Sequence, residues 1–429
     1  MIARVETECR SCGSTSLQEI IAFGSTPLAD RLLRADQLDE PELAADLTLA
    51  ICEACGLVQI LETVDPEILF FAEYPYFSSV SPSLTAHFAA SAEAIMKRWP
   101  LGEQSLVVEA ASNDGYMLRN FAAAGIPVLG VDPAAAPANA AIDAGIPTWV
   151  DFFGLDLARR IVDERGHANV FLGNNVLAHV PDLNGFVAGI AELLDGDGVA
   201  VIEAPYVVDL VDHCEFDTIY HQHLCYFSVT ALDALVRRHG LFLNDIERTA
   251  IHGGSLRLFI EKTDDPKPVI DELLTLERNR GFDCPAAYHD FSARITELKR
   301  SLREILDEVI ADGSSIAGYG AAAKATTLLA YCGIDSTYLD YVCDLNEYKQ
   351  GRFMGGNHLA IKPPSELKTD PPDFVLILAW NFAAEIMAQN EWFSEQGGRF
   401  IVPVPEPHVV GSESQDRATT HRTPKVENQ

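Results

Sequence analysis

The sequence predicts an α/β protein in three parts, and three observations carry this prediction. Two Cys-x-x-Cys pairs near the N-terminus indicate a small zinc-binding module. From residue 106 to residue 262, short apolar runs alternate with amphipathic stretches, which is typical of a doubly wound sheet with crossover helices. From residue 315, a strand, a glycine-rich turn and a helix begin a second, Rossmann-like α/β domain.

The chain length agrees with a division into several domains. A chain of 429 residues is too long for one ordinary core, and about three domains is the expected number. We expect a zinc-binding module at residues 1–75, a central domain at 76–264, a helical connector at 265–312 and a Rossmann-like domain at 313–410. Residues 411–429 have almost no apolar side chains and are expected to be disordered.

Composition and charge narrow the classes of partner. No run of about 18 apolar residues occurs and the N-terminus lacks a signal-peptide pattern, so we expect a cytoplasmic protein without membrane spans. The net charge is −32, which repels nucleic acid and anionic membranes over most of the surface. An anionic substrate therefore requires a local basic pocket.

The two cysteine pairs are the first element with chemical content. Each pair can offer two thiolates to one metal ion, and two pairs complete a tetrahedral zinc site with the ligands Cys9, Cys12, Cys52 and Cys55. Gly13 and Gly56 follow the pairs and suit the tight turn that such a site needs. Disulfides are the alternative, but nothing else in the sequence suggests export. Four thiolates leave no open position, so the role of the zinc is structural.

The segment after the zinc module is rich in hydroxyl groups. Pro75 and Pro82 keep residues 73–82 extended. Such a crossing could line a cleft between domains, where Tyr76, Ser78 and Ser79 could contact a ligand. Packing of the aromatic residues against the zinc module is the alternative.

The central domain opens with half of a nucleotide-binding βαβ unit. A buried strand from residue 106, a polar turn with Gly115, a helix to residue 124 and a strand ending at Asp132 follow one another. A carboxylate at that position can accept both hydroxyls of a ribose. Glu109, Ala111 and Asn113 replace the glycines of a dinucleotide site, and an acidic turn suits a cationic ligand such as S-adenosylmethionine better than a pyrophosphate. The predicted contacts are Glu109, Ser112, Asn113, Gly115, Asp132 and Pro133; an ordinary turn without a ligand is the alternative.

Two later strand ends add candidates to this site. Asp151 lies beside Phe152 and Phe153, so the acid could bind an adenine amino group and the rings could cover the base. The fourth strand ends in Asn174 and Asn175, at the carboxyl edge where doubly wound folds bind ligands.

Residues 216–228 are the most chemically loaded part of the chain. Two histidines, two tyrosines and an amide lie within seven residues, before a helix that Ser228 is expected to cap. A histidine can take a proton at neutral pH and a tyrosine hydroxyl can donate to a developing oxyanion, which suits proton abstraction next to a carbonyl. Purely structural histidines are the alternative.

The end of the central domain separates two fold families. Residues 241–248 and 255–262 read as strands joined by a short connection with Gly253 and Gly254, which predicts an antiparallel hairpin. A parallel sheet that finishes in such a hairpin is the class I methyltransferase arrangement, whereas a dehydrogenase domain continues parallel. Helices are expected at residues 269–280 and 288–311.

The last domain carries the pattern Gly-x-Gly-x-x-Ala from Gly318 to Ala323, followed by a strand at residues 338–344 that ends in an acid. This pattern formally fits NAD. Binding of a nucleotide diphosphate at the helix N-terminus, with Lys324, Lys349 and Arg352, is an equally physical interpretation. A purely structural α/β domain is the third.

With these residues identified, the chain resembles the sugar C-methyltransferases that act on nucleotide-linked 4-ketodeoxysugars in antibiotic biosynthesis. The resemblance covers nearly the whole chain and rests on the zinc cysteines, Tyr74-Pro-Tyr76-Phe-Ser-Ser, Glu109-Ala-Ala-Ser-Asn-Asp-Gly115, Asn175-Val-Leu-Ala-His179, Phe216-Asp-Thr-Ile-Tyr220-His-Gln-His223, His252-Gly-Gly-Ser-Leu-Arg257, Gly318-Tyr-Gly-Ala-Ala-Ala-Lys324 and Tyr348-Lys-Gln-Gly-Arg352.

The resemblance implies a structural zinc, S-adenosylmethionine as cofactor, and a thymidine diphosphate (TDP) 4-keto-deoxysugar that is methylated at C3. It implies His223 as the base and Tyr220 as a donor to the enolate, with Tyr76 and His179 at the substrate. Family members usually read Tyr-His-Glu-His in the loop, and Gln222 replaces the Glu here. Two alternatives stay open: an NAD-dependent nucleotide-sugar oxidoreductase and a non-catalytic zinc-containing binding protein. A monomer or homodimer is expected, without nucleic-acid partners.

Overall fold

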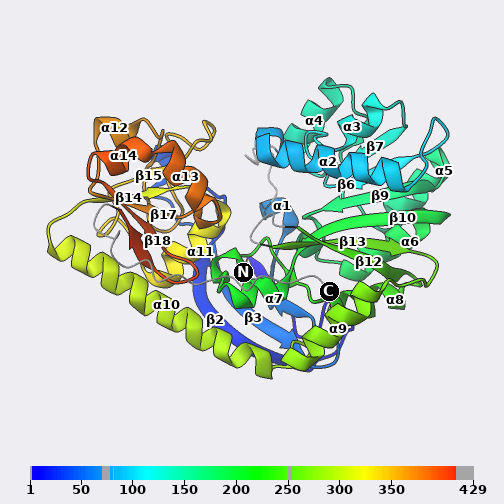
Figure 1. Ribbon diagram of the computed structural model, residues 1–429, viewed down its shortest axis with the longest axis horizontal. Coiled ribbons are helices and arrows are strands. Elements are labelled where there is room, and N and C mark those ends of the chain that lie inside the picture. Colours follow the sequence, from blue (N-terminus) through cyan, green and yellow to red (C-terminus); the bar gives the residue numbers. More distant parts are fainter. Residues whose placement is uncertain (1, 70–77, 81, 250–253, 412–429) are drawn as a thin grey trace, which may run out of the picture.

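The computed structural model describes residues 2–69, 78–80, 82–249 and 254–411. Figure 1 shows two α/β parts on opposite sides of the molecule, with the long helix α10 (Ala286–Ala311) and the strands β2 and β3 running below them. Tyr76, His252 and Gly253, as well as the tail at 412–429, lie outside the described residues, so the predictions made for them stay predictions.

The central sheet has seven strands in the order β12-β13-β10-β9-β6-β7-β8. Five strands are parallel: β6 (Val107–Ala110), β7 (Val128–Val131), β8 (Thr148–Trp149), β9 (Ala168–Asn174) and β10 (Leu194–Pro205). The antiparallel strand β13 (Ser255–Glu261) lies between β10 and β12 (Phe242–Thr249). This order and the final hairpin confirm the class I methyltransferase fold.

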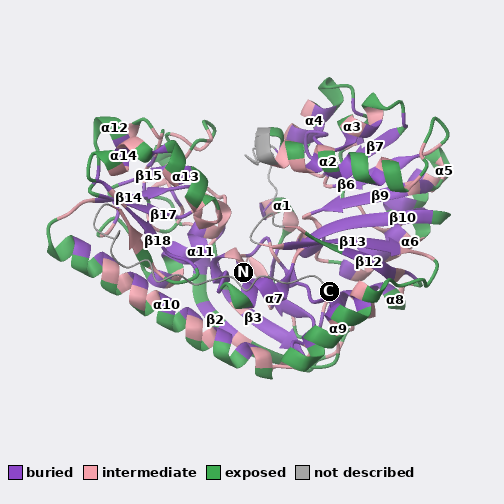
Figure 2. Cartoon of the chain, in the orientation of Figure 1, coloured by how far each residue is buried: buried purple, intermediate pink, exposed green. Residues whose placement is uncertain are grey.

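Helices cover both faces of this sheet because side chains alternate between the faces along each strand. In β6, Val107 packs into a core with Phe88 and Phe121, whereas Val108 packs into the other core with Ile161 and Phe186. The first core belongs to α2 (Pro82–Arg98) and α3 (Leu118–Ala123), and the second to α5 (Leu155–Arg165) and α6 (Leu183–Leu193). Figure 2 shows the resulting buried strands between helices with exposed outer sides. The remaining helices of this part are α4 (Ala135–Asp143), α7 (Val207–Asp212) and α8 (Val229–Arg238), and Ser228 caps α8 as predicted, by accepting from the Ala231 N–H.

The N-terminal sheet contains a strand that comes from the central part of the chain. Its order is β11-β4-β3-β2, with β2 at Leu17–Pro27, β3 at Ala44–Cys52, β4 at Val58–Ile60 and β11 at Cys225–Tyr226. Cys225 is opposite Gln59 and Tyr226 is opposite Val58. From the sequence, residues 225 and 226 are expected in a loop, and the structure differs because two residues are too few to give a strand pattern. Beside this sheet, β1 (Ala3–Val5) pairs with β5 (Glu62–Val64), and α1 spans Pro66–Leu69.

The C-terminal sheet has six strands in the order β16-β15-β14-β17-β18-β19, and all but β19 are parallel. The strands are β14 (Ile316–Tyr319), β15 (Val342–Cys343), β16 (Ile361–Lys362), β17 (Phe374–Ile377), β18 (Arg399–Val402) and β19 (His408–Val410). The helices are α11 (Ala323–Cys332), α12 (Glu366–Thr369), α13 (Ala383–Gln389) and α14 (Glu391–Glu395). The prediction of a strand over 338–344 was too long, because the Tyr338 and Leu339 N–H groups both donate to the Asp335 carbonyl and form a turn instead.

Helix α10 joins the two α/β parts, after α9 (Pro268–Arg280). Its buried side chains follow helical spacing, among them Phe291, Ile295, Leu298 and Leu302. Arg294 donates to the Val211 and Asp212 carbonyls at the end of α7, and Arg303 donates to the Cys332 and Gly333 carbonyls at the end of α11. One helix thus caps the C-terminus of a helix on each side. None of the described helices is long and apolar enough to cross a membrane.

Candidate active site

A cleft of about 1170 Å³ lies where the three parts of the chain meet. The carboxyl ends of the central strands form one wall, and the start of α11 with the ends of β15 and β17 forms the opposite wall. Residues 215–226 close the base of the cleft together with Asp30 and Pro66 of the N-terminal module. The cleft therefore brings together residues that are far apart in the sequence.

Asp132 anchors the central wall. Its Oδ2 accepts from the Asn113 N–H at 2.8 Å and its Oδ1 accepts from the Ala134 N–H at 2.8 Å. Burial raises the pKa of Asp132 to about 6, so the carboxylate is still ionised at neutral pH. Asn113 and Ala111 have φ values of +49° and +54°, the left-handed region that glycine usually occupies. The turn therefore keeps a glycine-type backbone without the glycines, which a search for a glycine pattern misses.

Three predicted cofactor residues do not reach this wall. Glu109 is fully buried below it, where its Oε1 accepts from Asn174 Nδ2 at 3.0 Å. Burial raises the pKa of Glu109 to about 8. Ser112 packs behind the turn against Gly130, and Gly115 packs against Ile146. Glu109 thus positions Asn174, and the other two shape the turn.

The remaining predicted cofactor residues line the cleft, with one exception. Pro133, Phe152, Phe153, Asn174 and Asn175 are on the wall, whereas Asp151 is exposed and its carboxylate accepts from the Phe152 N–H at 2.8 Å. The buried Asn175 Oδ1 has no hydrogen-bond partner among the described residues. The described part of this wall carries carboxylate and amide oxygens and no lysine or arginine. These oxygen atoms accept hydrogen bonds and attract a cation, which fits the positively charged S-adenosylmethionine.

Of the hydroxyl-rich segment, only its end is described. The Ser78 N–H donates to Asn113 Oδ1 at 2.9 Å and Ser78 lines the cleft. The Ser79 N–H donates to Asp114 Oδ2 at 3.2 Å, and Ser79 is exposed away from the cleft. Hydrogen bonds therefore join the end of this segment to the turn that contains Asn113 and Asp114.

The loop at the base of the cleft brings His223, Tyr220 and His179 together. His223 Nδ1 lies 2.8 Å from the Thr218 carbonyl, which can only accept, so Nδ1 carries the proton. His223 Nε2 is therefore the acceptor of the Tyr220 hydroxyl at 3.0 Å. The ring of His179 lies 4.8 Å from that of His223, and burial lowers the pKa of His179 to about 4, which keeps it neutral. The three side chains lie together on the cleft wall and offer an acid–base group.

Gln222 lies beside this group and contacts the N-terminal module. It is buried, and its Nε2 donates to the Ala29 carbonyl at 3.4 Å. An ionised Glu at this position would have no proton to donate, so this contact depends on the amide group of Gln222. His221 Nε2 donates to the Asp46 carbonyl at 3.0 Å in the same module.

The zinc cysteines lie at the end of the sheet that holds this loop. The Sγ atoms of Cys9, Cys12, Cys52 and Cys55 all lie within 4.8 Å of one another, and they are the single such cluster found in the described part of the chain. Gly13 and Gly56 have φ values of +73° and +72°, as the tight turns require. Four converging thiol groups fit one tetrahedral zinc. Cys52 ends β3, which pairs with β4, and β4 pairs with β11, so the zinc site and the His223 loop share one sheet.

The C-terminal wall repeats the backbone pattern of the central wall. Asp344 Oδ2 accepts from the Ala321 N–H at 2.7 Å and Asp344 Oδ1 accepts from the Asn346 N–H at 2.8 Å. These two bonds match those of Asp132 one for one. The cleft thus has two facing turns of the same design.

The second turn differs from the first because two lysines, Lys324 and Lys349, lie beside it. Lys324 at the start of α11 donates to Asn381 Oδ1 and lies 3.8 Å from the centroid of the Trp380 ring. Lys349 Nζ donates to Asp30 at 3.2 Å and to the Ala321 carbonyl at 2.8 Å. Both lysines line the cleft, whereas Arg352 does not. This wall therefore offers the cations that an anionic ligand needs.

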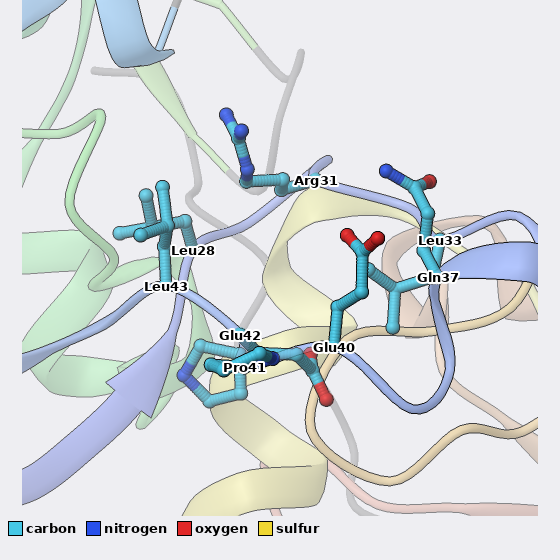
Figure 3. A pocket seen from close by; sticks show the side chains of 9 residues that line it. Leu28, Arg31, Leu33, Gln37, Glu40, Pro41, Glu42 and Leu43 are labelled. Atoms are coloured by element: carbon cyan, nitrogen blue, oxygen red, sulfur yellow. The ribbon is translucent and has the colours of Figure 1, made fainter.

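A second hollow, of about 90 Å³, lies next to the chain between β2 and β3. Figure 3 shows that its lining combines the apolar Leu28 and Leu43 with charged side chains such as Arg31 and Glu40. It is too small for a nucleotide, so the large cleft is the candidate active site.

Comparisons with known proteins agree with this architecture. Residues 9–70 match a family model described as a zinc binding domain, residues 86–244 match a methyltransferase domain, and residues 250–405 match a C-methyltransferase C-terminal domain. C-methyltransferase NovU of Streptomyces niveus is 36% identical over 96% of this chain and 99% of its own length.

Two solved structures illustrate a resemblance to part of the chain. The PH0226 protein of Pyrococcus horikoshii OT3 covers 45% of this chain and 95% of its own, with 13% identity and a TM-score of 0.36. Magnesium protoporphyrin IX methyltransferase (ChlM) of Synechocystis PCC 6803, with bound SAM, covers 41% of this chain and 79% of its own, with 13% identity and a TM-score of 0.32.

The buried Glu109 gives a pH-dependent prediction for stability. Its pKa is about 8 in the folded chain against a usual 4.5, so between these values the folded state holds one proton more than the unfolded state. This group therefore lowers the stability of the wild type as pH rises, by up to about 1.4 kcal/mol per pH unit. We expect Glu109→Gln to unfold at higher urea concentration than wild type, with a difference that grows from pH 5 to pH 8. The exposed Glu103→Gln is the control, and a pH-independent difference for Glu109→Gln contradicts the prediction.

Loss of the metal gives a second prediction. Cys12→Ser removes one ligand, so we expect loss of bound zinc and a fall in methyl transfer of about tenfold or more, because the sheet that holds His223 loosens. Elemental analysis measures the zinc and calorimetry measures S-adenosylmethionine binding, which should stay near wild type. Cys284→Ser, a cysteine of similar exposure outside the cluster, is the control. A Cys12→Ser protein without zinc but with full activity shows that the metal does not support the site.

Proposed function

Because the chain belongs to the S-adenosylmethionine-dependent C-methyltransferases, we propose that it methylates C3 of a TDP-linked 4-keto-deoxysugar. The observation that carries the proposal is the Tyr220–His223–Thr218 hydrogen-bond chain, which lies between a wall without lysine or arginine among its described residues and a wall with two lysines. Membership of this family sets aside the oxidoreductase and the non-catalytic binding protein.

The proposed reaction begins with proton removal. A ketone at C4 acidifies the hydrogen on C3, and His223 Nε2 is the base because Nδ1 already carries a proton. The ketone oxygen replaces Nε2 as the acceptor of the Tyr220 hydroxyl, which frees the Nε2 lone pair and stabilises the enolate oxygen. S-adenosylmethionine supplies the methyl group that C3 receives.

The surroundings of His223 favour this step. The Thr218 carbonyl holds the imidazole in one tautomer and stabilises the imidazolium that forms. His179 stays neutral 4.8 Å away, so it does not repel that charge. Ser78, at the junction with the cofactor turn, is proposed to contact the sugar, and Tyr76 keeps its predicted role there.

The residues of the C-terminal wall suit the nucleotide part of the proposed substrate. Asp344 has the same backbone bonds as Asp132, which suits a nucleoside hydroxyl. Lys324 and Lys349 can neutralise phosphate groups. Lys324 lies in the first turn of α11, where the helix dipole also favours an anion. The central wall, without such cations, suits a nucleoside that carries no phosphate. We therefore assign the cofactor to the central wall and the diphosphate sugar to the C-terminal wall.

The proposal is tested by incubating the protein with S-adenosylmethionine and a TDP-4-keto-2,6-dideoxyhexose in deuterated buffer, with mass spectrometry of the sugar. A gain of one methyl group is expected. With His223→Ala, we expect both methylation and deuterium exchange at C3 to fall to background, whereas His167→Ala, an exposed histidine, keeps both. Exchange at the wild-type rate in His223→Ala would show that His223 is not the base. If the wild type shows no methylation and no exchange, the proposed substrate is wrong.

The two facing turns give a paired prediction. Asp344→Asn loses an acceptor, so we expect its Kd for TDP to rise about 10- to 100-fold while its Kd for S-adenosylmethionine stays unchanged. Asp132→Asn is the matched variant and should show the reverse. Isothermal titration calorimetry measures both. If Asp344→Asn binds TDP as tightly as wild type, the nucleotide is not held at the second turn.

A further inference from the structure

We propose that the C-terminal domain sets the position and the tautomer of His223 by holding the peptide chain on both sides of the Thr218 carbonyl. Asp217, Thr327 and Trp380 are positioning residues in this inference. It rests on the proposed function, because His223 matters as a base only if the reaction begins with proton removal.

Two hydrogen bonds cross from the C-terminal domain to this short segment. Trp380 Nε1 donates to Asp217 Oδ2 at 2.7 Å, and Thr327 Oγ1 donates to the Ile219 carbonyl at 2.7 Å. Asp217, Ile219 and Thr327 are buried, so water cannot replace these partners. The residue between the two anchored positions is Thr218, whose carbonyl accepts from His223 Nδ1.

The position of that carbonyl decides whether His223 can act as a base. A neutral imidazole carries one proton on either nitrogen, and its partners select which one. A shift of the Thr218 carbonyl by about 1 Å stretches the 2.8 Å contact beyond hydrogen-bond range. The proton can then move to Nε2, which no longer has a lone pair for the substrate. The Tyr226 hydroxyl also approaches the Thr218 carbonyl, at 3.5 Å, but it holds neither neighbour of Thr218.

The rest of the loop is held by other parts of the molecule. After His223, the Leu224 N–H donates to the Ala178 carbonyl, and residues 225 and 226 pair with β4 of the zinc-binding module. Before His223, the C-terminal domain holds Asp217 and Ile219, whereas His221 and Gln222 contact the zinc-binding module. Removing the C-terminal contacts therefore leaves Thr218 held through its two bonds to the Glu215 carbonyl of the same segment, so the Thr218 side of the contact is weakened more than the His223 side.

The same domain carries the proposed phosphate contact. Lys324 lies 3.8 Å from the centroid of the Trp380 ring, and Trp380 is the donor to Asp217. Burial raises the pKa of Asp217, while the nearby Lys324 ammonium and the Trp380 bond lower it. The Trp380 side chain thus contacts both Lys324, the proposed phosphate contact, and Asp217, which helps to hold the segment next to His223.

The inference is tested with the double variant Trp380→Phe/Thr327→Val, which removes both donors; Val keeps the shape of Thr, and Phe keeps an aromatic ring for the Lys324 contact. Nitrogen-15 NMR of histidine-labelled protein reports the tautomer, with the His223 signals assigned by their absence in His223→Gln. We expect Nδ1–H in the wild type and a mixture of tautomers in the double variant. We also expect a fall in kcat of at least tenfold with an unchanged Kd for S-adenosylmethionine. Trp392→Phe, in the same domain but away from the loop, is the control and should match wild type.

A double variant with the wild-type tautomer and kcat overturns the inference. If the double variant does not fold, Asp217→Asn and Asp217→Leu replace it. Asn keeps an acceptor for Trp380 and should keep the Nδ1–H tautomer, whereas Leu should lose it; equal tautomer ratios in the two variants overturn the inference. The NMR readout needs no turnover. If wild type shows no exchange or methylation, the proposed function fails, and the tautomer ratio still decides the inference.

Discussion

The pairing of β11 with β4 is the interaction on which the site depends. Two residues, Cys225 and Tyr226, join the sheet of the zinc-binding module and fix the chain two positions after His223. Without this pairing, the module would contact the His223 loop through single bonds such as those of His221 and Gln222. With it, the zinc ligand Cys52, three strands from the N-terminal module and the loop that holds His223 belong to one sheet. This explains how a zinc ion with four protein ligands and no open position can matter for a reaction in which it takes no part.

The two walls of the cleft repeat one backbone arrangement. Each wall uses an aspartate that accepts two backbone N–H groups at the end of a strand. Both walls carry carboxylates and amides, and the difference is that Lys324 and Lys349 line the second wall only. In a chain with a net charge of −32, two lysines on one wall form a local exception that directs an anion to that wall.

Much of this could be predicted from the sequence. Strong periodicity gave the central strands and helices, the hairpin gave the fold family, and cysteine spacing gave the metal site. The site was predicted less well, because burial is not visible in a motif: Glu109 and Ser112 have polar side chains in the expected turn but lie behind it. The pairing at Cys225 and the bond from Trp380 to Asp217 join residues more than 150 positions apart, and no local pattern encodes such contacts. The roles of the site residues remain predictions.

Helix α10 has a consequence for how such a protein can vary in length. Arg294 and Arg303 cap helices on opposite sides of the cleft and are nine residues apart, which is about 13 to 14 Å along the axis. Deleting one residue between them moves one arginine by about 1.5 Å and turns it by about 100° relative to the other. One of the two caps is then lost, and the apolar stripe is broken at the same point. The spacing between Arg294 and Arg303 is therefore fixed by the two caps. Substitutions in this interval are compatible with both caps, whereas a single insertion or deletion is not, so we expect length changes among relatives in the surface loops.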